Sequence, residues 1–202
     1  TLNHAYGSAE DIPDLIRALA DEDDDIRDKT LYALYSNIWH QGTVYQATAY
    51  AVPFLIELLD ADSVTRKYDI LIYLAHLAHG SSYLDMHSDH LMSPDYESDE
   101  FQQQVAKEEH YVQRTYQMVC EGMDVYFRLL IDTSEELHTR MAVAYLLACF
   151  TDSHTHIVPR LKSLLPDEPE SLMRASLILA LRYLQQEQID AFDLEPYLAP
   201  DE

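Results

Sequence analysis

Apolar and polar residues follow the same order four times along this chain. In each copy, apolar residues at helical spacing lead to a Leu or Ile, an acidic turn follows, and a second apolar segment opens near a basic residue. The acidic turns lie at residues 20–25, 60–63, 132–136 and 166–170. We therefore expect four helical hairpins, at about residues 9–39, 47–79, 123–150 and 155–186. Strands are not expected, because the chain has no long alternating run and no Asn-Gly or Asp-Gly turn.

The spacing within the copies supports a repeat. A proline early in the first helix precedes a basic residue of the second helix by 14, 14 and 15 positions in the pairs Pro13 and Arg27, Pro53 and Lys67, and Pro159 and Arg174. The third copy has Asp124-Val125 where the proline would stand. Proline suits a first helical turn, since its missing N–H has no partner there. Asp11 is the expected N-cap before Pro13.

This arrangement of Pro-x-Leu-x-x-Leu-Leu, an acidic turn and a basic residue resembles the HEAT repeat over about residues 9–186. The junction at residues 36–48 is also similar to one found in a group of bacterial HEAT-repeat proteins without a settled activity. The resemblance implies a short right-handed α-solenoid of the armadillo type, with a general role in binding. We thus predict an all-α fold in one domain, residues 1–202.

Two stretches interrupt the repeat, and one follows it. Residues 81–100 are polar and are expected to form an insertion loop, either specific for a partner or merely tolerated. An extra helix is expected at about residues 101–120. Residues 187–202 are expected to cap the last hairpin, as the ends of such stacks require.

The net charge of −23 limits the choice of partners. Thirty-six Asp and Glu oppose only 13 Lys and Arg, and residues 68–106 contain seven acids and no Lys or Arg. Binding to nucleic acid or to an anionic membrane is disfavoured, because both depend on basic side chains. A basic partner protein would be attracted. The alternative is that the charge serves solubility alone.

The cysteines and the hydropathy of the chain lead us to expect a cytoplasmic protein. Cys120 and Cys149 lie in apolar helical runs and are expected to be free core thiols in a reducing cytoplasm. The chain has no apolar run of the length that crosses a bilayer and no pattern of a secretory signal at its first residues.

Histidines provide the only candidates for a metal site. His76 and His79 lie three residues apart on an expected helix, and His87 and His90 follow beside Asp85 and Asp89. Such ligands can bind a transition metal, but ligands on a long loop are poorly positioned. We favour no metal and no cofactor.

No residue pattern in the chain indicates a specific enzymatic activity. The chain contains no Gly-x-Ser-x-Gly, phosphate-binding loop or Cys-x-x-Cys motif. It also lacks the His-Glu pairs of HEAT-like di-iron hydroxylases and the strong basic charge of HEAT-like DNA glycosylases. HEAT-like bilin lyases are compatible with its composition, although no residue indicates a bilin pocket.

Partner-binding residues are expected in three places. Trp39 is the only tryptophan and lies at the junction between the first two hairpins, where it is either an interface anchor or core. Tyrosines of the second helices are expected on the concave face of the solenoid. The acidic loop is the third place. The full set is Tyr32, Tyr35, Asn37, Trp39, His40, Gln41, Tyr45, Asp85, Asp89, Asp95 and Glu97.

Together these features predict a non-catalytic scaffold whose acidic concave surface binds a basic partner protein. A narrower alternative is an immunity or antitoxin-like inhibitor that covers the basic active site of a nuclease toxin. A metal-dependent or bilin-lyase-like HEAT enzyme is the contrary alternative.

Overall fold

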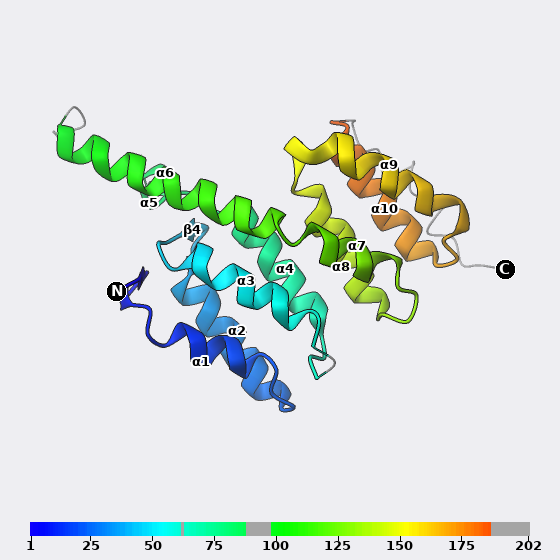
Figure 1. The fold of residues 1–202 in the computed structure, drawn as a ribbon, viewed down its shortest axis with the longest axis horizontal. Helices are drawn as coiled ribbons and strands as arrows, with labels where there is room; N and C mark the ends of the chain where they lie inside the picture. The colour runs from blue at the N-terminus through cyan, green and yellow to red at the C-terminus, as the bar shows by residue number, and fades with distance from the viewer. Residues whose placement is uncertain (62, 88–97, 187–202) are drawn as a thin grey trace. The chain divides into compact units, whose positions relative to one another are not determined.

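A computed structural model describes residues 1–61, 63–87 and 98–186 (Figure 1). This part of the chain is mostly helical and is built by helix-on-helix packing, so the predicted all-α class is correct. Two compact units are present. Counting only the described residues, the first comprises residues 1–61, 63–65, 76–87 and 98–122, and the second comprises residues 66–75 and 123–186.

The first unit contains α1 (Ile12–Ala18), α2 (Asp24–Asn37), α3 (Thr48–Leu58), α5 (Tyr83–His87) and α6 (Asp99–Cys120). Helix α1 packs on α2 and α3, and α3 packs on α6 (Figure 1). Buried aliphatic side chains fill the space between them, among them Leu34, Val52 and Leu55. Helix α4 (Lys67–Ala78) is divided, since only its last three residues belong to this unit.

The second unit contains α7 (Met123–Ile131), α8 (Leu137–Ala148), α9 (His154–Leu164) and α10 (Ser171–Leu184). Short 3-10 turns at Thr151–Ser153 and Leu165–Asp167 flank α9. Helix α8 packs between α7 and α10, and α9 lies beside α10 (Figure 1). The core includes stacked rings of Tyr126 and Phe150, with centroids 6.3 Å apart.

Only one of the three repeat prolines lies in the first turn of its helix. Pro13 is in the first turn of α1, as expected, but Asp11 gives no side-chain cap and instead accepts a hydrogen bond from Asn37. Pro53 and Pro159 each occupy the sixth position of their helix, α3 and α9. A proline there cannot donate to the carbonyl four residues earlier, so each helix lacks one internal hydrogen bond.

The basic residues of three second helices bond to the backbone that precedes them. Nη1 of Arg27 donates to the carbonyl of Asp21, and Nη1 of Arg174 donates to the carbonyl of Glu168 at 2.9 Å, each reaching six residues back. Nε of Arg140 donates to the carbonyl of Leu130 at 3.0 Å. The bonds of Arg27 and Arg174 satisfy backbone oxygens of the turn before their own helix, and the bond of Arg140 joins α8 to α7.

Two very short hairpins of strands correct the expectation of none. The first pairs β1 (Asn3–His4) with β2 (Gly7–Ser8), and the second pairs β3 (Trp39–His40) with β4 (Thr43–Val44). Gln41 and Gly42 connect β3 to β4 with φ of 52° and 89°. Two successive positive φ angles are those of a type I′ turn, which matches the twist of paired strands.

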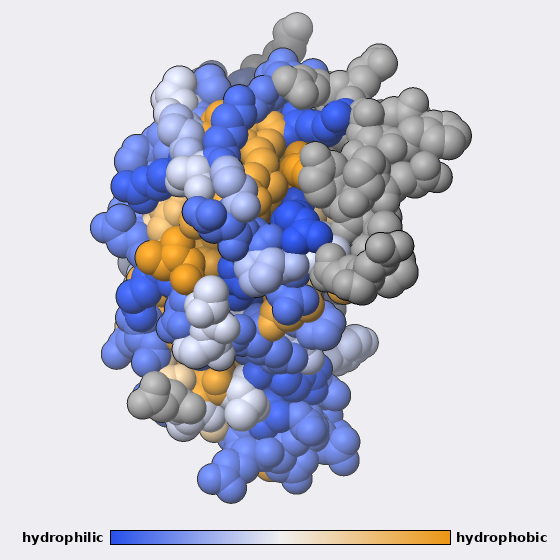
Figure 2. Space-filling view, turned by 90° about the vertical axis from the view of Figure 1, so that its right-hand side faces the viewer, coloured by the Kyte–Doolittle hydropathy of each residue, from blue (hydrophilic) through white to orange (hydrophobic). Residues whose placement is uncertain are grey.

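The surface of the described residues carries scattered apolar groups. Figure 2 shows one face of the molecule, where separate apolar patches are surrounded by hydrophilic residues. No helix in the described ranges has both the length and the hydropathy needed to cross a bilayer.

Candidate functional site

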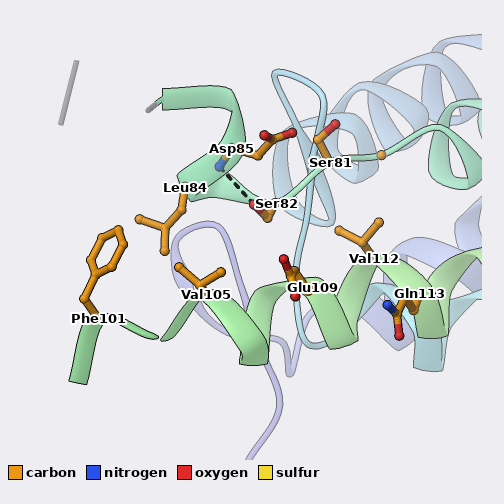
Figure 3. Close-up of a pocket in the computed structure, with 10 residues that line it drawn as sticks. Ser81, Ser82, Leu84, Asp85, Phe101, Val105, Glu109, Val112 and Gln113 are labelled. Carbon is orange, nitrogen blue, oxygen red and sulfur yellow. Dashed lines mark hydrogen bonds between the residues drawn. The ribbon is translucent and has the colours of Figure 1, made fainter. Parts of the chain in front are cut away.

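The candidate site is a pocket of about 620 Å³ in the first unit, between residues 80–85 and α6 (Figure 3). Such a volume is in the range of small-ligand sites in proteins. Its lining residues are Gly80, Ser81, Ser82, Leu84, Asp85, Phe101, Val105, Glu109, Val112 and Gln113.

The strand hairpin at the junction positions one wall of this pocket. The N–H of Val44 donates to the carbonyl of Ser81 at 3.0 Å, and the N–H of Ser81 donates to the carbonyl of Gly42 at 2.8 Å. Gly80 is buried against Val44, and a side chain on Gly80 would overlap Val44 and approach the carbonyl of Leu77. Residues 80–82 are thereby held to β4.

Helix α5 begins at the same wall, and its first N–H groups have side-chain acceptors. Ser82 Oγ accepts from the N–H of Asp85 at 2.9 Å, as Figure 3 shows. Glu108 Oε2 accepts from the N–H of Leu84 at 2.9 Å. These side chains thus accept from N–H groups at the start of α5, which have no acceptor within the helix.

Glu108 fixes α5 to α6. Its side chain is buried, and its second oxygen accepts from Gln104 Nε2 at 2.7 Å. A buried carboxylate needs such donors, because burial without them is strongly unfavourable. Glu108 is therefore a structural group at the edge of the pocket.

The other wall is one face of α6. Phe101, Val105 and Val112 recur at helical spacing, and Glu109 lies between the last two. In Figure 3 the side chains of Val105, Glu109 and Val112 rise from α6 toward residues 81–85, while Leu84 points toward Phe101 and Val105. The pocket thus combines an apolar floor with the carboxylates of Glu109 and Asp85, which are both exposed.

This arrangement suits a cationic group on an apolar stem. Aliphatic and aromatic side chains can contact the methylene groups of Lys or Arg, while a carboxylate binds the charged end. Among the described residues, no three His, Cys, Asp or Glu side chains lie close enough to share a metal ion.

The junction residues form an aromatic cluster next to this wall. The indole N–H of Trp39 donates to the carbonyl of His76 at 2.9 Å, and the two rings stack with centroids 5.4 Å apart. The hydroxyl of Tyr35 is 2.7 Å from Nδ1 of His76. Partial burial, and to a smaller extent the nearby His79, lower the pKa of His76. These contacts are typical of packing between helices.

The remaining junction residues vary in exposure. Asn37 binds Asp11, and His40 lies 3.4 Å from the hydroxyl of the exposed Tyr6. Burial raises the pKa of Tyr45. Gln41 is at the exposed turn between β3 and β4, and Tyr32 on α2 is 76% exposed.

The sequence-predicted acidic site is described in part. Asp85 lines the pocket, whereas Asp89, Asp95 and Glu97 lie outside the described residues, as does His90. His87 is the last residue of α5. The expected loop at residues 81–100 includes this helix and the first residues of α6.

Sequence reasoning did not single out Glu109, Ser82 or the apolar face of α6. The signal was available as the spacing of Phe101, Val105 and Val112, but it gives no indication of which segment that face contacts.

Comparison with protein families, with curated proteins and with solved structures finds no match to this chain. The case for its function therefore depends on the site itself.

Proposed function

We propose that this chain is a non-catalytic binding module that captures a basic segment of a partner protein. The observation that carries the proposal is the pocket of Figure 3, where Glu109 and Asp85 border an apolar floor. A Lys or Arg side chain of the partner would enter this pocket, with its stem against Val105 and Leu84. The net charge of −23 would increase the rate of encounter with such a partner.

The finer fold that goes with this role is a short solenoid of HEAT-like hairpins. Two features support it: the equivalent prolines Pro53 and Pro159 at the sixth position of their helices, and the arginines that bond to the preceding turns. In such a stack the second helix of each hairpin lines one face, which is available for binding.

The distribution of charge directs the basic segment to the first unit. Helices α8 and α10 of the second unit contain no Asp or Glu. They carry exposed uncharged side chains instead, namely Tyr145, Leu172, Leu179 and Tyr183. We propose that these side chains make apolar contacts with the partner, and that Tyr32 on α2 contributes an aromatic contact in the first unit.

An inhibitor of a nuclease toxin is the second candidate. The excess of carboxylates favours it, because a nuclease site that binds phosphates would also attract acidic side chains. Competition with nucleic acid distinguishes the inhibitor from the general binding module. If short DNA or RNA displaces this chain from its partner, the chain covers the nucleic-acid site of that partner.

The proposal is tested by capture from a lysate of the source cells at low and high salt. Three proteins are compared: wild type, the pocket variant with Asp85→Asn and Glu109→Gln, and a control with Glu22→Gln and Asp25→Asn. Both variants lose two negative charges, but the control changes only exposed positions of the first acidic turn. We expect a basic protein that the wild type and the control retain, that high salt releases, and that the pocket variant retains much less. Equal retention by the two variants would contradict a role for the pocket.

A further inference from the structure

A second depression lies on another side of α6, against the start of α3. It has a volume of about 450 Å³, and all its lining residues belong to the first unit. These residues are Gln46, Ala49, Tyr50, His110, Tyr111, Arg114 and Gln117. None of them is a carboxylate, although the chain has 36 Asp and Glu.

The geometry of α6 separates this site from the acidic pocket. His110, Arg114 and Gln117 are spaced by four and three residues, so they share one face of the helix. Glu109 and Gln113 line the acidic pocket from a different face. One helix therefore presents acidic groups to one depression and basic groups to the other.

Arg114 differs from several other arginines of this chain. Several others have an ion pair or a backbone acceptor: Arg17 with Asp14, Arg27 with Asp24, Arg66 with Asp69, Arg140 with Glu168, and Arg174 with the carbonyls of Glu168 and Pro169. Arg114 is exposed and has no ion pair with any residue in the described ranges. Its guanidinium is thus available to a ligand.

The surrounding groups add donors and flat apolar surface. Gln46 accepts from the N–H of Asn3 through Oε1, which leaves its amide nitrogen to donate elsewhere. Tyr50 is 61% exposed on α3, and Ala49 beside it has only a methyl group, which leaves room between the helices. Tyr111 contributes a second ring from α6.

We propose that this depression binds an oxyanion carried on a planar ring, as in an aryl phosphate or an aryl carboxylate. Arg114 binds the oxyanion with two parallel hydrogen bonds, the geometry for which a guanidinium is suited. Gln117 and His110 donate further hydrogen bonds, and the rings of Tyr50 and Tyr111 contact the planar group. This site is independent of the proposed capture of a basic segment.

The test is a calorimetric titration of the full chain with phenyl phosphate, benzoate and inorganic phosphate. The variants are Arg114→Gln and, as a matched control, Lys107→Gln, which removes an exposed charge from the same helix outside the depression. We expect phenyl phosphate or benzoate to bind, Arg114→Gln to weaken that binding at least about tenfold, and Lys107→Gln to leave it within about twofold. Inorganic phosphate should bind more weakly than phenyl phosphate, because it makes no contact with the tyrosine rings.

Three outcomes would overturn the proposal: no binding of either aryl anion, an equal loss of affinity in both variants, or equal affinity for phenyl phosphate and inorganic phosphate. Far-UV circular dichroism of each variant verifies that its helices are intact. Tyr111→Leu provides an additional readout, since it should reduce affinity for phenyl phosphate while leaving inorganic phosphate unchanged.

Discussion

Replacing the buried ion pair between Arg140 and Glu168 should have a strongly non-additive effect on stability. Arg140 is 6% exposed and Glu168 is 7% exposed. Nη2 of Arg140 is paired with Oε2 of Glu168, and Nε donates to the carbonyl of Leu130 at 3.0 Å. Oε1 of Glu168 also accepts from the N–H of Glu170. The pair joins α8 to the turn before α10 within the second unit.

The expected magnitudes follow from what each change leaves behind. Arg140→Met leaves a buried carboxylate without its cation, and Glu168→Met leaves a buried guanidinium without its anion. Removing one partner of a buried pair costs about 3–5 kcal/mol. The double variant leaves no buried charge, and its remaining cost is that of unpaired backbone groups, about 1–3 kcal/mol. The coupling free energy is then about 3 kcal/mol or more.

The assay is urea unfolding of the wild type, both single variants and the double variant, followed by far-UV circular dichroism. Each single variant should also lower the midpoint of thermal unfolding by about 6 °C or more, at roughly 2–4 °C per kcal/mol for a chain of this size. If the two single effects instead add up in the double variant to within about 0.5 kcal/mol, the reasoning from a buried ion pair is refuted.

Three further predictions concern single residues. The pKa of His76 is lowered in the folded state, so its contribution to stability is complete above the unfolded pKa of 6.5 and is lost as pH falls from there through the folded pKa. The free energy of unfolding of wild type should therefore fall more than that of His76→Gln between about pH 7 and about pH 5. Parallel curves of unfolding free energy against pH would contradict this. Burial raises the pKa of Cys149 to about 12, so mass spectrometry should find Cys120 alkylated under native conditions well before Cys149, and equal labelling would be inconsistent with the structure. Gly80→Ala would place a methyl group against Val44 and should lower the free energy of unfolding by about 1–3 kcal/mol, which chemical unfolding can measure. An unchanged denaturant midpoint would contradict this, because it would show that Val44 can move aside without cost.

The hydrophobic pattern predicted the helices well, although it gave no sign that two prolines would lie inside them. The extra helix expected at residues 101–120 is α6, Asp99–Cys120. The hairpins expected from about residues 47 and 155 begin with α3 at Thr48 and α9 at His154, and Pro53 and Pro159 lie inside these helices. Tertiary packing accounts for this, because a helix packed in a core can tolerate one missing hydrogen bond.

Short elements were missed because their signals are local. The turn at Gln41-Gly42 has the backbone of a type I′ turn without the usual Asn-Gly sequence, so the hairpin of β3 and β4 was not predicted. Helix α5 depends on Glu108, which is 24 residues from the N–H group that it binds. A contact at that sequence separation is not visible in a helical period.

Of the candidate site, the sequence predicted only the negative charge. Asp85 was identified from the run without Lys or Arg, and it does line the pocket. Glu109 was not selected, because an acidic residue on a long polar helix is ordinarily a solvated one. Its significance comes from the apolar residues beside it and from the wall that β4 holds opposite.

The central claim is that Glu109 and Asp85 form a specific site for a basic side chain, and nuclear magnetic resonance tests it most directly. An amide-resolved titration with the peptide acetyl-Leu-Lys-Leu-amide compares wild type with the pocket variant, Asp85→Asn and Glu109→Gln. The account predicts saturable shifts concentrated at residues 80–85 and 105–113 in wild type, and their loss in the variant. The contradicting result is a set of shifts that spread equally over the acidic turns, such as residues 21–25, and that stay unchanged in the variant. It would show that the peptide is attracted by the overall negative charge and does not bind at the pocket.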